Sequence, residues 1–285
     1  MPLRCIFVPT GPGIQPERRL DAALRLARHT HAHIDTLFVS PDDGARPPSP
    51  NPASATSLLP HCTAACEMKA LAAVAREAFQ RWSAGANVPQ QSVHRLDATF
   101  ASWREQSGEV ETIVALAGRV NDLIIIDNPT KGGRFETAAF DAAVFSSWRP
   151  TLIVSEQLPG DLLHHVVIAW NGSLEGARVV GQSIALLHEA KRISIITIPS
   201  EHERETGVAD LGHYLHRHGI VVEPAALVSL TSWTAGEKIL ASCKSVGATM
   251  LVTGAYTHSR LRQAFLGGVT QHILATARLP ILMAH

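Results

Sequence analysis

This chain of 285 residues lacks both the excess charge of nucleic-acid-binding proteins and the long apolar runs of membrane proteins. Lys and Arg together number 25, and so do Asp and Glu, so no net field attracts phosphate backbones or anionic lipid at neutral pH. No stretch approaches the roughly 18 apolar residues that a membrane span requires. The sequence therefore predicts neither nucleic acid nor membrane as a partner.

Cysteine is scarce too, with Cys5, Cys62, Cys66 and Cys243 in a chain too large to need disulfides for its stability. We interpret Cys62 and Cys66 as small apolar residues near a helix start, and a redox or metal role is the alternative. The opening MPLRCIFVPTGPG has a shorter apolar run than a secretory signal. These features lead us to expect a cytoplasmic protein.

The common signatures of catalysis and phosphate binding are missing as well. The chain has no Gly-Lys-Ser/Thr loop, no G-x-G-x-x-G after its first strand and no G-x-S-x-G around Ser173. An enzyme with its own chemistry is therefore disfavoured, and slow ATP hydrolysis at a binding site is the most that we expect. Two histidine clusters, at 29–33 and 213–218, favour titrating surface side chains over a metal site, because neighbours two apart diverge.

The chain does contain the same pattern in each half. Short β-branched runs ended by turn residues alternate with segments of helical spacing, which predicts β-α-β-α-β-α-β-α-β twice. The predicted strands pair as 3–8 with 166–170, 33–40 with 192–200, 92–97 with 220–228, 121–127 with 248–254, and 149–155 with 279–285. The predicted helices include 64–84 beside 205–218 and 106–118 beside 235–246.

Strands that are apolar throughout and separated by helices predict parallel sheets covered on both faces. We therefore expect an α/β protein of two doubly wound domains, at 1–156 and 163–285, since a chain of this length suits two cores. Residues 40–60 are rich in Pro and Ser and are interpreted as a surface insertion in the first domain.

The closing segment carries the most specific motif. Gly254 ends a predicted strand, Thr257 follows after two residues, and nine more lead to Gly267 and Gly268 at a predicted helix start. This spacing resembles the glycine motif of nucleotide-binding universal stress proteins, with Thr257 at its second glycine and Gly268 at its Ser or Thr. The resemblance covers nearly the whole chain. It implies two tandem five-stranded parallel-sheet domains of the universal stress protein fold, which is adenine nucleotide alpha hydrolase-like.

The resemblance also implies where a nucleotide binds in the second domain. Glycines at a strand end let backbone N–H groups approach a ligand, and a helix start directs unpaired N–H groups at an anion. An alternative is that Asn171 and Gly172 only form a turn and Ser173 caps the next helix. The implied site, with ATP and Mg²⁺ as ligand, consists of Asn171, Gly172, Gly254, His258, Arg260, Gly267, Gly268 and Thr270.

The first domain departs further from the motif. It has no predicted glycine pair at its last helix start, where Phe140 and Asp141 lie, so we expect a degenerate, structural domain. The resemblance implies a stress-response regulatory protein that binds an adenine nucleotide in its second domain. The alternative is an interaction protein without nucleotide that acts through its dimeric surface. In the family the last strands pair, which implies that 150–155 pairs with 280–285 and leaves a further homodimer open.

Overall fold

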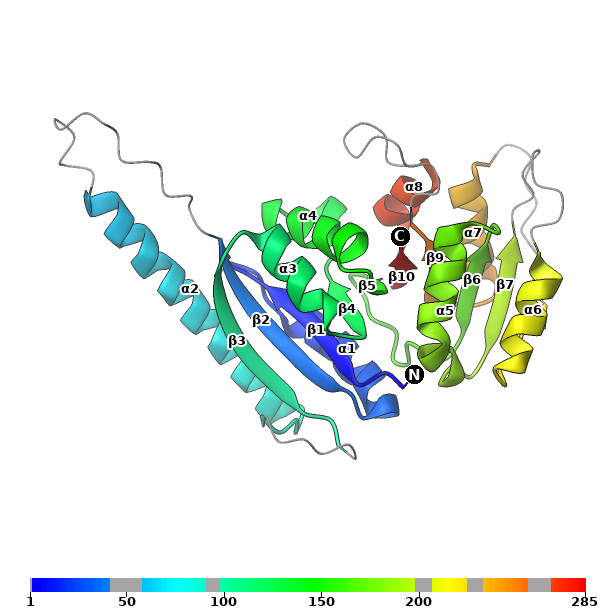
Figure 1. Ribbon diagram of the computed structural model, residues 1–285, viewed down its shortest axis with the longest axis horizontal. Helices are drawn as coiled ribbons and strands as arrows, with labels where there is room; N and C mark the ends of the chain where they lie inside the picture. The colour runs from blue at the N-terminus through cyan, green and yellow to red at the C-terminus, as the bar shows by residue number, and fades with distance from the viewer. Residues whose placement is uncertain (1, 42–57, 91–97, 198–206, 225–232, 256–267) are drawn as a thin grey trace.

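One continuous sheet runs through the molecule and carries both halves of the chain (Figure 1). The structure is a computed structural model that describes residues 2–41, 58–90, 98–197, 207–224, 233–255 and 268–285, with the side chains of 58–65 and 224 left out. The strand order is β3-β2-β1-β4-β5-β10-β9-β6-β7-β8. Each half therefore repeats one order, with its first strand in the middle.

The first half contributes five strands to this sheet, and so does the second. The first half contains β1 (Cys5–Thr10), α1 (Glu17–Thr30), β2 (His33–Pro41), α2 (Leu58–Gly85), β3 (Ala101–Gly108), α3 (Val110–Arg119), β4 (Leu123–Ile126), the 3-10 helix η2 (Pro129–Lys131), α4 (Arg134–Asp141), the π-helical turn η3 (Ala142–Ser146) and β5 (Thr151–Ile153). The second contains β6 (Val166–Trp170), α5 (Leu174–His188), β7 (Ile193–Thr197), α6 (Val208–Arg217), β8 (Glu223–Pro224), α7 (Ala235–Ser245), β9 (Met250–Gly254), α8 (Gly268–Thr276) and β10 (Ile281–Ala284).

Strand direction separates the two halves. Neighbouring strands within each half are parallel. At the junction β10 pairs antiparallel with β5, and Leu282 lies opposite Leu152. Two doubly wound, five-stranded parallel sheets in tandem are thus confirmed. Because the junction is antiparallel, the carboxyl ends of the strands point to opposite edges of the sheet in the two halves.

Helices cover both faces of the sheet, as alternation along β1 illustrates. Ile6 and Val8 face one core, which also contains residues of α1, α2, α5 and α6. Phe7 faces the other core, which contains residues of α3, α4, α7 and α8. All three side chains are completely buried. Consecutive residues of this strand are apolar because helices cover both faces of the sheet.

Some element boundaries differ from the prediction in the first half. The predicted helix at 106–118 was wrong at its start, because β3 continues to Gly108 and α3 begins at Val110. The predicted strand at 92–97 lies outside the described residues. Residues 58–60 of the predicted insertion already belong to α2, which extends beyond the edge of the sheet (Figure 1). No described helix, α2 included, is long and apolar enough to cross a bilayer.

Candidate ligand sites at the strand ends

The carboxyl edge of the second half is where the sequence predicts a nucleotide. β6 ends at Trp170 and leads into a turn where Gly172 has φ 72°, a left-handed conformation that glycine adopts without strain. Asn171 Oδ1 accepts from the backbone N–H of Ser173 at 3.2 Å, and Ser173 Oγ accepts from the N–H of Gly176 at 3.1 Å. The structure therefore shows both the turn at Asn171 and Gly172 and the cap at Ser173.

Gly254 ends β9 against the first turn of α5. A Cβ added to Gly254 would lie 2.7 Å from the backbone nitrogen of Gly176 and 3.0 Å from Cβ of Glu175. Because no side chain fits at that distance, the packing of strand on helix is sufficient reason for a glycine here. Gly176 in turn lies against Asn171 Oδ1, so the structure brings Asn171, Gly172 and Gly254 together.

The remaining predicted residues lie on α8 or outside the described part of the chain. Gly268 is exposed at the first described position of α8, and a Cβ added to it would meet no atom of the described residues within 4 Å. Thr270 is buried in the same turn. α8 packs on the face of the sheet opposite α5. Outside the described residues lie Thr257, His258, Arg260 and Gly267.

The equivalent edge of the first half contains a cavity of about 380 Å³. It is lined by the loop after β1, the start of α1, the segment from Asp127 to Glu136, the end of β5 and Ala277 of the second half. Strand registers relate the two edges, because Ile124 pairs with Thr151 as Leu251 pairs with Ile281. Asp127 therefore occupies the position that Gly254 has in the second half.

A buried arginine lies beneath this cavity. Arg19 is 1% exposed and donates to backbone carbonyls at the end of β1 and in the loop after it. Its Nε lies 3.1 Å from Asp127 Oδ2, and Arg18 reaches the other oxygen of that carboxylate at 2.6 Å. Burial lowers the pKa of Arg19, and the charge of Asp127 opposes this shift. The carboxylate thus stabilises a guanidinium that has no access to water.

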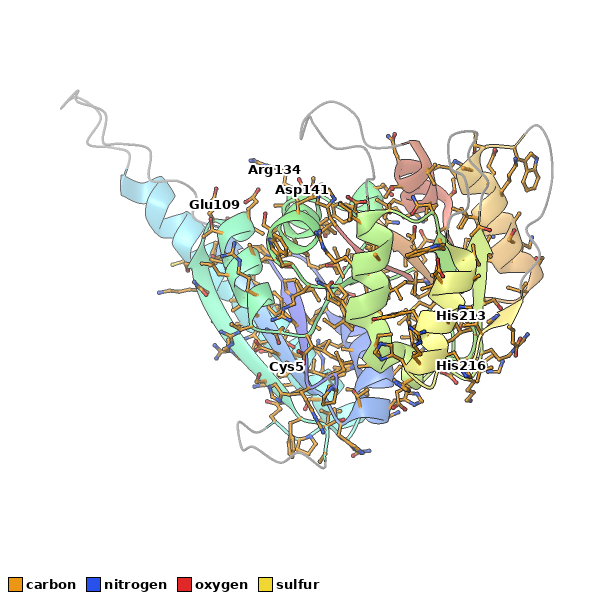
Figure 2. The ribbon with its side chains drawn as sticks, turned by 45° about the vertical axis from the view of Figure 1, so that its right-hand side comes forward. Cys5, Glu109, Arg134, Asp141, His213 and His216 are labelled. Carbon is orange, nitrogen blue, oxygen red and sulfur yellow. The ribbon has the colours of Figure 1, made fainter. Side chains whose placement is uncertain are left out.

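The start of α4 carries a second carboxylate. The helix runs between Arg134 and Asp141, both labelled in Figure 2, and the N–H of Gly133 donates to Glu136 Oε2 at 2.7 Å. A Cβ on Gly132 would lie 2.5 Å from Cβ of Glu136, so the loop needs glycine there. The prediction of no glycine pair near this helix start was wrong, because Gly132 and Gly133 directly precede Arg134, where α4 begins, whereas Phe140 and Asp141 lie at its end. Carboxylates here and at Asp127 disfavour a phosphate in the first half.

At the carboxyl strand ends of each half, residues of the opposite half make contacts. Asn128 Nδ2 donates to the carbonyl of Leu274 in the last turn of α8 at 2.6 Å, close to Ala277 in the cavity lining. On the other edge, the ring of His285 packs 5.0 Å from the ring of Phe145 and donates through Nδ1 to the carbonyl of Ala255 at 3.1 Å. This exchange follows from the antiparallel junction of β5 and β10.

Sequence reasoning missed the charged residues of the cavity. A signal was present in α1, where Arg19 shares a stripe of spacing four with Ala23 and Ala27, both buried. A cation on such a stripe predicts a buried carboxylate partner. The partner, Asp127, lies more than a hundred residues away and could not be named from the pattern.

The histidine clusters form no further site within the described ranges. His213 and His216 lie on α6 (Figure 2), with His218 at the end of that helix. Across the part of the chain that the structure describes, no group of three or more His, Cys, Asp or Glu side chains is placed to hold a metal ion.

Two doubly wound domains joined edge to edge define the class of fold, and solved structures give it a name. The chain matches a universal stress protein from Archaeoglobus fulgidus DSM 4304 with a TM-score of 0.70 and 13% identity, over 98% of this chain and 95% of that one. A putative universal stress protein from Pseudomonas aeruginosa UCBPP-PA14 matches with a TM-score of 0.52 and 15% identity, over 98% and 92%. The chain therefore has the universal stress protein fold in tandem form.

A functionally unknown protein from Pseudomonas aeruginosa PAO1 is similar to the same degree, with a TM-score of 0.52 and 16% identity over 98% of this chain and 92% of that one. No protein-family model and no curated protein matches the chain. At identities this low the likeness concerns the fold.

Proposed function

We propose that this chain is a stress-response regulatory protein of the universal stress type, which binds ATP with Mg²⁺ at the carboxyl edge of its second half. The observation that carries the proposal is the difference between the two halves. At the end of the fourth strand and at the start of the last helix, the first half has the carboxylates of Asp127 and Glu136. The second half has Gly254 in the place of Asp127, and the first turn of α8, which begins at Gly268, contains no acidic residue.

The chemistry of the second edge suits an anion better for two reasons. The N-terminal end of α8 presents the positive end of the helix dipole, and Gly268 adds no side chain between its backbone and solvent. Phosphate groups would contact this helix start together with Gly267, and Arg260 and His258 would supply charge. Asn171 and Gly172 would lie toward the base or ribose, and Thr270 would support the helix start.

Regulation follows from what the nucleotide contacts. A ligand that binds one conformation of the protein better than another changes the surface offered to partners in the cytoplasm. Catalysis is not needed for this role, and hydrolysis would be a slow side reaction.

The proposal is tested first by mass spectrometry of gently purified, then denatured protein, where ATP or another adenine nucleotide is expected. Calorimetric titration with ATP–Mg²⁺ should then show that Gly268→Asp lowers the affinity by at least about tenfold, because a carboxylate opposes phosphate. Gly268→Ala is the matched control, which adds a Cβ in open space and should keep the affinity. Equal affinities in the two variants would exclude this helix start.

A second candidate is an interaction protein that binds no nucleotide and acts through its surface, including that of a homodimer. It is favoured by the structural roles of Asn171, whose Oδ1 completes the turn, and of Gly254, whose contact with Gly176 explains it without a ligand. Protein that carries no nucleotide and gives no heat with ATP–Mg²⁺ would support this candidate.

A further inference from the structure

The cavity of the first half is a second candidate site whose chemistry differs from that of a nucleotide site. Its volume of about 380 Å³ lies in the range of small-molecule pockets. Both halves of the chain contribute to its wall, since Ala277 follows α8 while the other lining residues belong to the first half. A ligand there would contact the loop after β1, the end of β4 and the end of β5 together.

Four of the five charged side chains that line the cavity form two pairs of opposite sign, and the fifth, Glu136, accepts from the N–H of Gly133. Arg18 lies 2.6 Å from Asp127, and Lys131 Nζ lies 2.7 Å from Glu156 Oε1. The side chains of Arg18 and Lys131 are 43% and 48% exposed, so water competes with their carboxylate partners. Both cations can therefore exchange a protein carboxylate for one from a ligand at little cost.

The carboxylates in the lining determine which ligand charge the cavity favours. Asp127 is only 12% exposed, and a purely anionic ligand that took Arg18 from it would face that carboxylate across the cavity. A purely cationic ligand would instead compete with Arg18 and Lys131 for their own partners. A molecule with both charges can offer its carboxylate to the two cations and its ammonium group to the two carboxylates, so that no charge is left without a partner.

We propose that this cavity binds a small zwitterion of the α-amino-acid class. The ligand carboxylate binds Lys131 and Arg18, and its ammonium group binds the carboxylates of Glu156 and Asp127. The site is separate from the nucleotide site proposed in the second half, and neither proposal depends on the other.

The test uses the full-length protein and the common α-amino acids, titrated singly at millimolar concentration and followed by calorimetry and by the thermal unfolding midpoint. At least one amino acid should bind and raise the midpoint. Lys131→Met should weaken that binding by about tenfold or more, because it removes one of the two cations that bind the ligand carboxylate. Lys191→Met is the matched control, since Lys191 forms a similar exposed pair with Asp161 at 3.0 Å, away from the cavity lining.

Three outcomes would overturn the proposal. The first is that no amino acid produces heat or a midpoint shift. The second is equal binding by Lys131→Met and Lys191→Met. The third is loss of ATP–Mg²⁺ binding in Lys131→Met, which would make this cavity the nucleotide site. If Gly268→Asp alone abolishes ATP binding while amino-acid binding persists, both proposals stand, and if ATP never binds while an amino acid does, this one stands alone.

Discussion

The residue at the end of the fourth strand differs in charge and size between the two halves, being Asp127 in the first and Gly254 in the second. In the first half Asp127 forms an ion pair with the buried Arg19, and the contact between strand and helix is made through side chains. In the second half Gly254 and Gly176 let the backbones of β9 and α5 touch directly. The ion pair has a desolvation cost that its hydrogen bonds must offset, whereas the glycine pair has none. The same topology therefore tolerates two different contacts at one point.

Gly254→Ala should destabilise the protein because its Cβ would meet backbone atoms that cannot rotate away. We expect a loss of about 1–3 kcal/mol in the free energy of unfolding, the usual cost of overpacking. Urea denaturation followed by tryptophan fluorescence measures it. Gly268→Ala is the control, and alanine in that open helical position should be neutral or stabilise by up to about 1 kcal/mol. Similar midpoints for the two variants would show that the contact with Gly176 relaxes freely.

Thiol reactivity should follow burial in the native protein. Burial raises the pKa of Cys243 to about 12. Burial, followed by the charges of Asp122 and Asp35, also raises the pKa of Cys5, labelled in Figure 2. Cys66 is exposed. With Ellman's reagent at neutral pH we expect Cys66 to react first, Cys5 more slowly and Cys243 only after unfolding. Mass mapping of the modified cysteines checks this order, and early labelling of Cys243 would contradict it.

At the scale of single residues, the sequence predicts interactions between residues that are close together in the chain. The turn at Asn171 and the cap at Ser173 involve residues two or three apart, so turn and capping preferences suffice to find them. The role of Gly254 was interpreted through a motif, and its contact with Gly176 was missed because the two glycines belong to different elements. The cavity charges were missed for the same reason.

At the scale of elements, apolar strands were predictable and polar ones were not. β4 and β9 are apolar and almost completely buried, and both lie inside the predicted ranges. β3 runs along β2 at the edge of the sheet, and four of its eight residues are exposed, so its sequence lacks an apolar run. α4 begins at Arg134, before the predicted helix start near Phe140 and Asp141, because the side chain of Glu136 folds back and accepts from the N–H of Gly133.

Asn128 links two elements of different halves, and its loss should loosen α8. Its Nδ2 donates to the carbonyl of Leu274, while its Oδ1 accepts from the N–H of Thr130. Asn128→Ser keeps an oxygen to cap Thr130 but removes the amide donor. One lost hydrogen bond of about 1 kcal/mol should make the amides of α8 exchange about fivefold faster.

Hydrogen exchange followed by mass spectrometry measures this effect, and α7 is the internal control, since it packs beside α8 without this bond. Unchanged exchange in α8, or an equal increase in α7, would show that Asn128 does not hold the helix from the first half.

At the scale of the whole molecule, the junction of β5 and β10 unites two domains into one structure. Leu152 and Leu282 are buried opposite each other and belong to one core cluster that continues from the first half into the second. The junction also lets each half wall the other's strand-end site, through Ala277 on one edge and Phe145 on the other. Two separate domains of this fold would lack these walls.

The first half expressed alone, residues 1–156, should therefore self-associate. Without β10, the Thr151–Ile153 edge exposes unpaired backbone groups and the buried side chain of Leu152, which an antiparallel β5 from a second copy can cover. Sedimentation velocity over a dilution series should show a dimer that dissociates on dilution, and circular dichroism should show native-like secondary structure. The full chain at the same concentrations is the control, because its β5 edge is already paired. A folded half that stays monomeric throughout would mean that β5 does not need a strand beside it, and that the junction contributes less to the fold than its burial indicates.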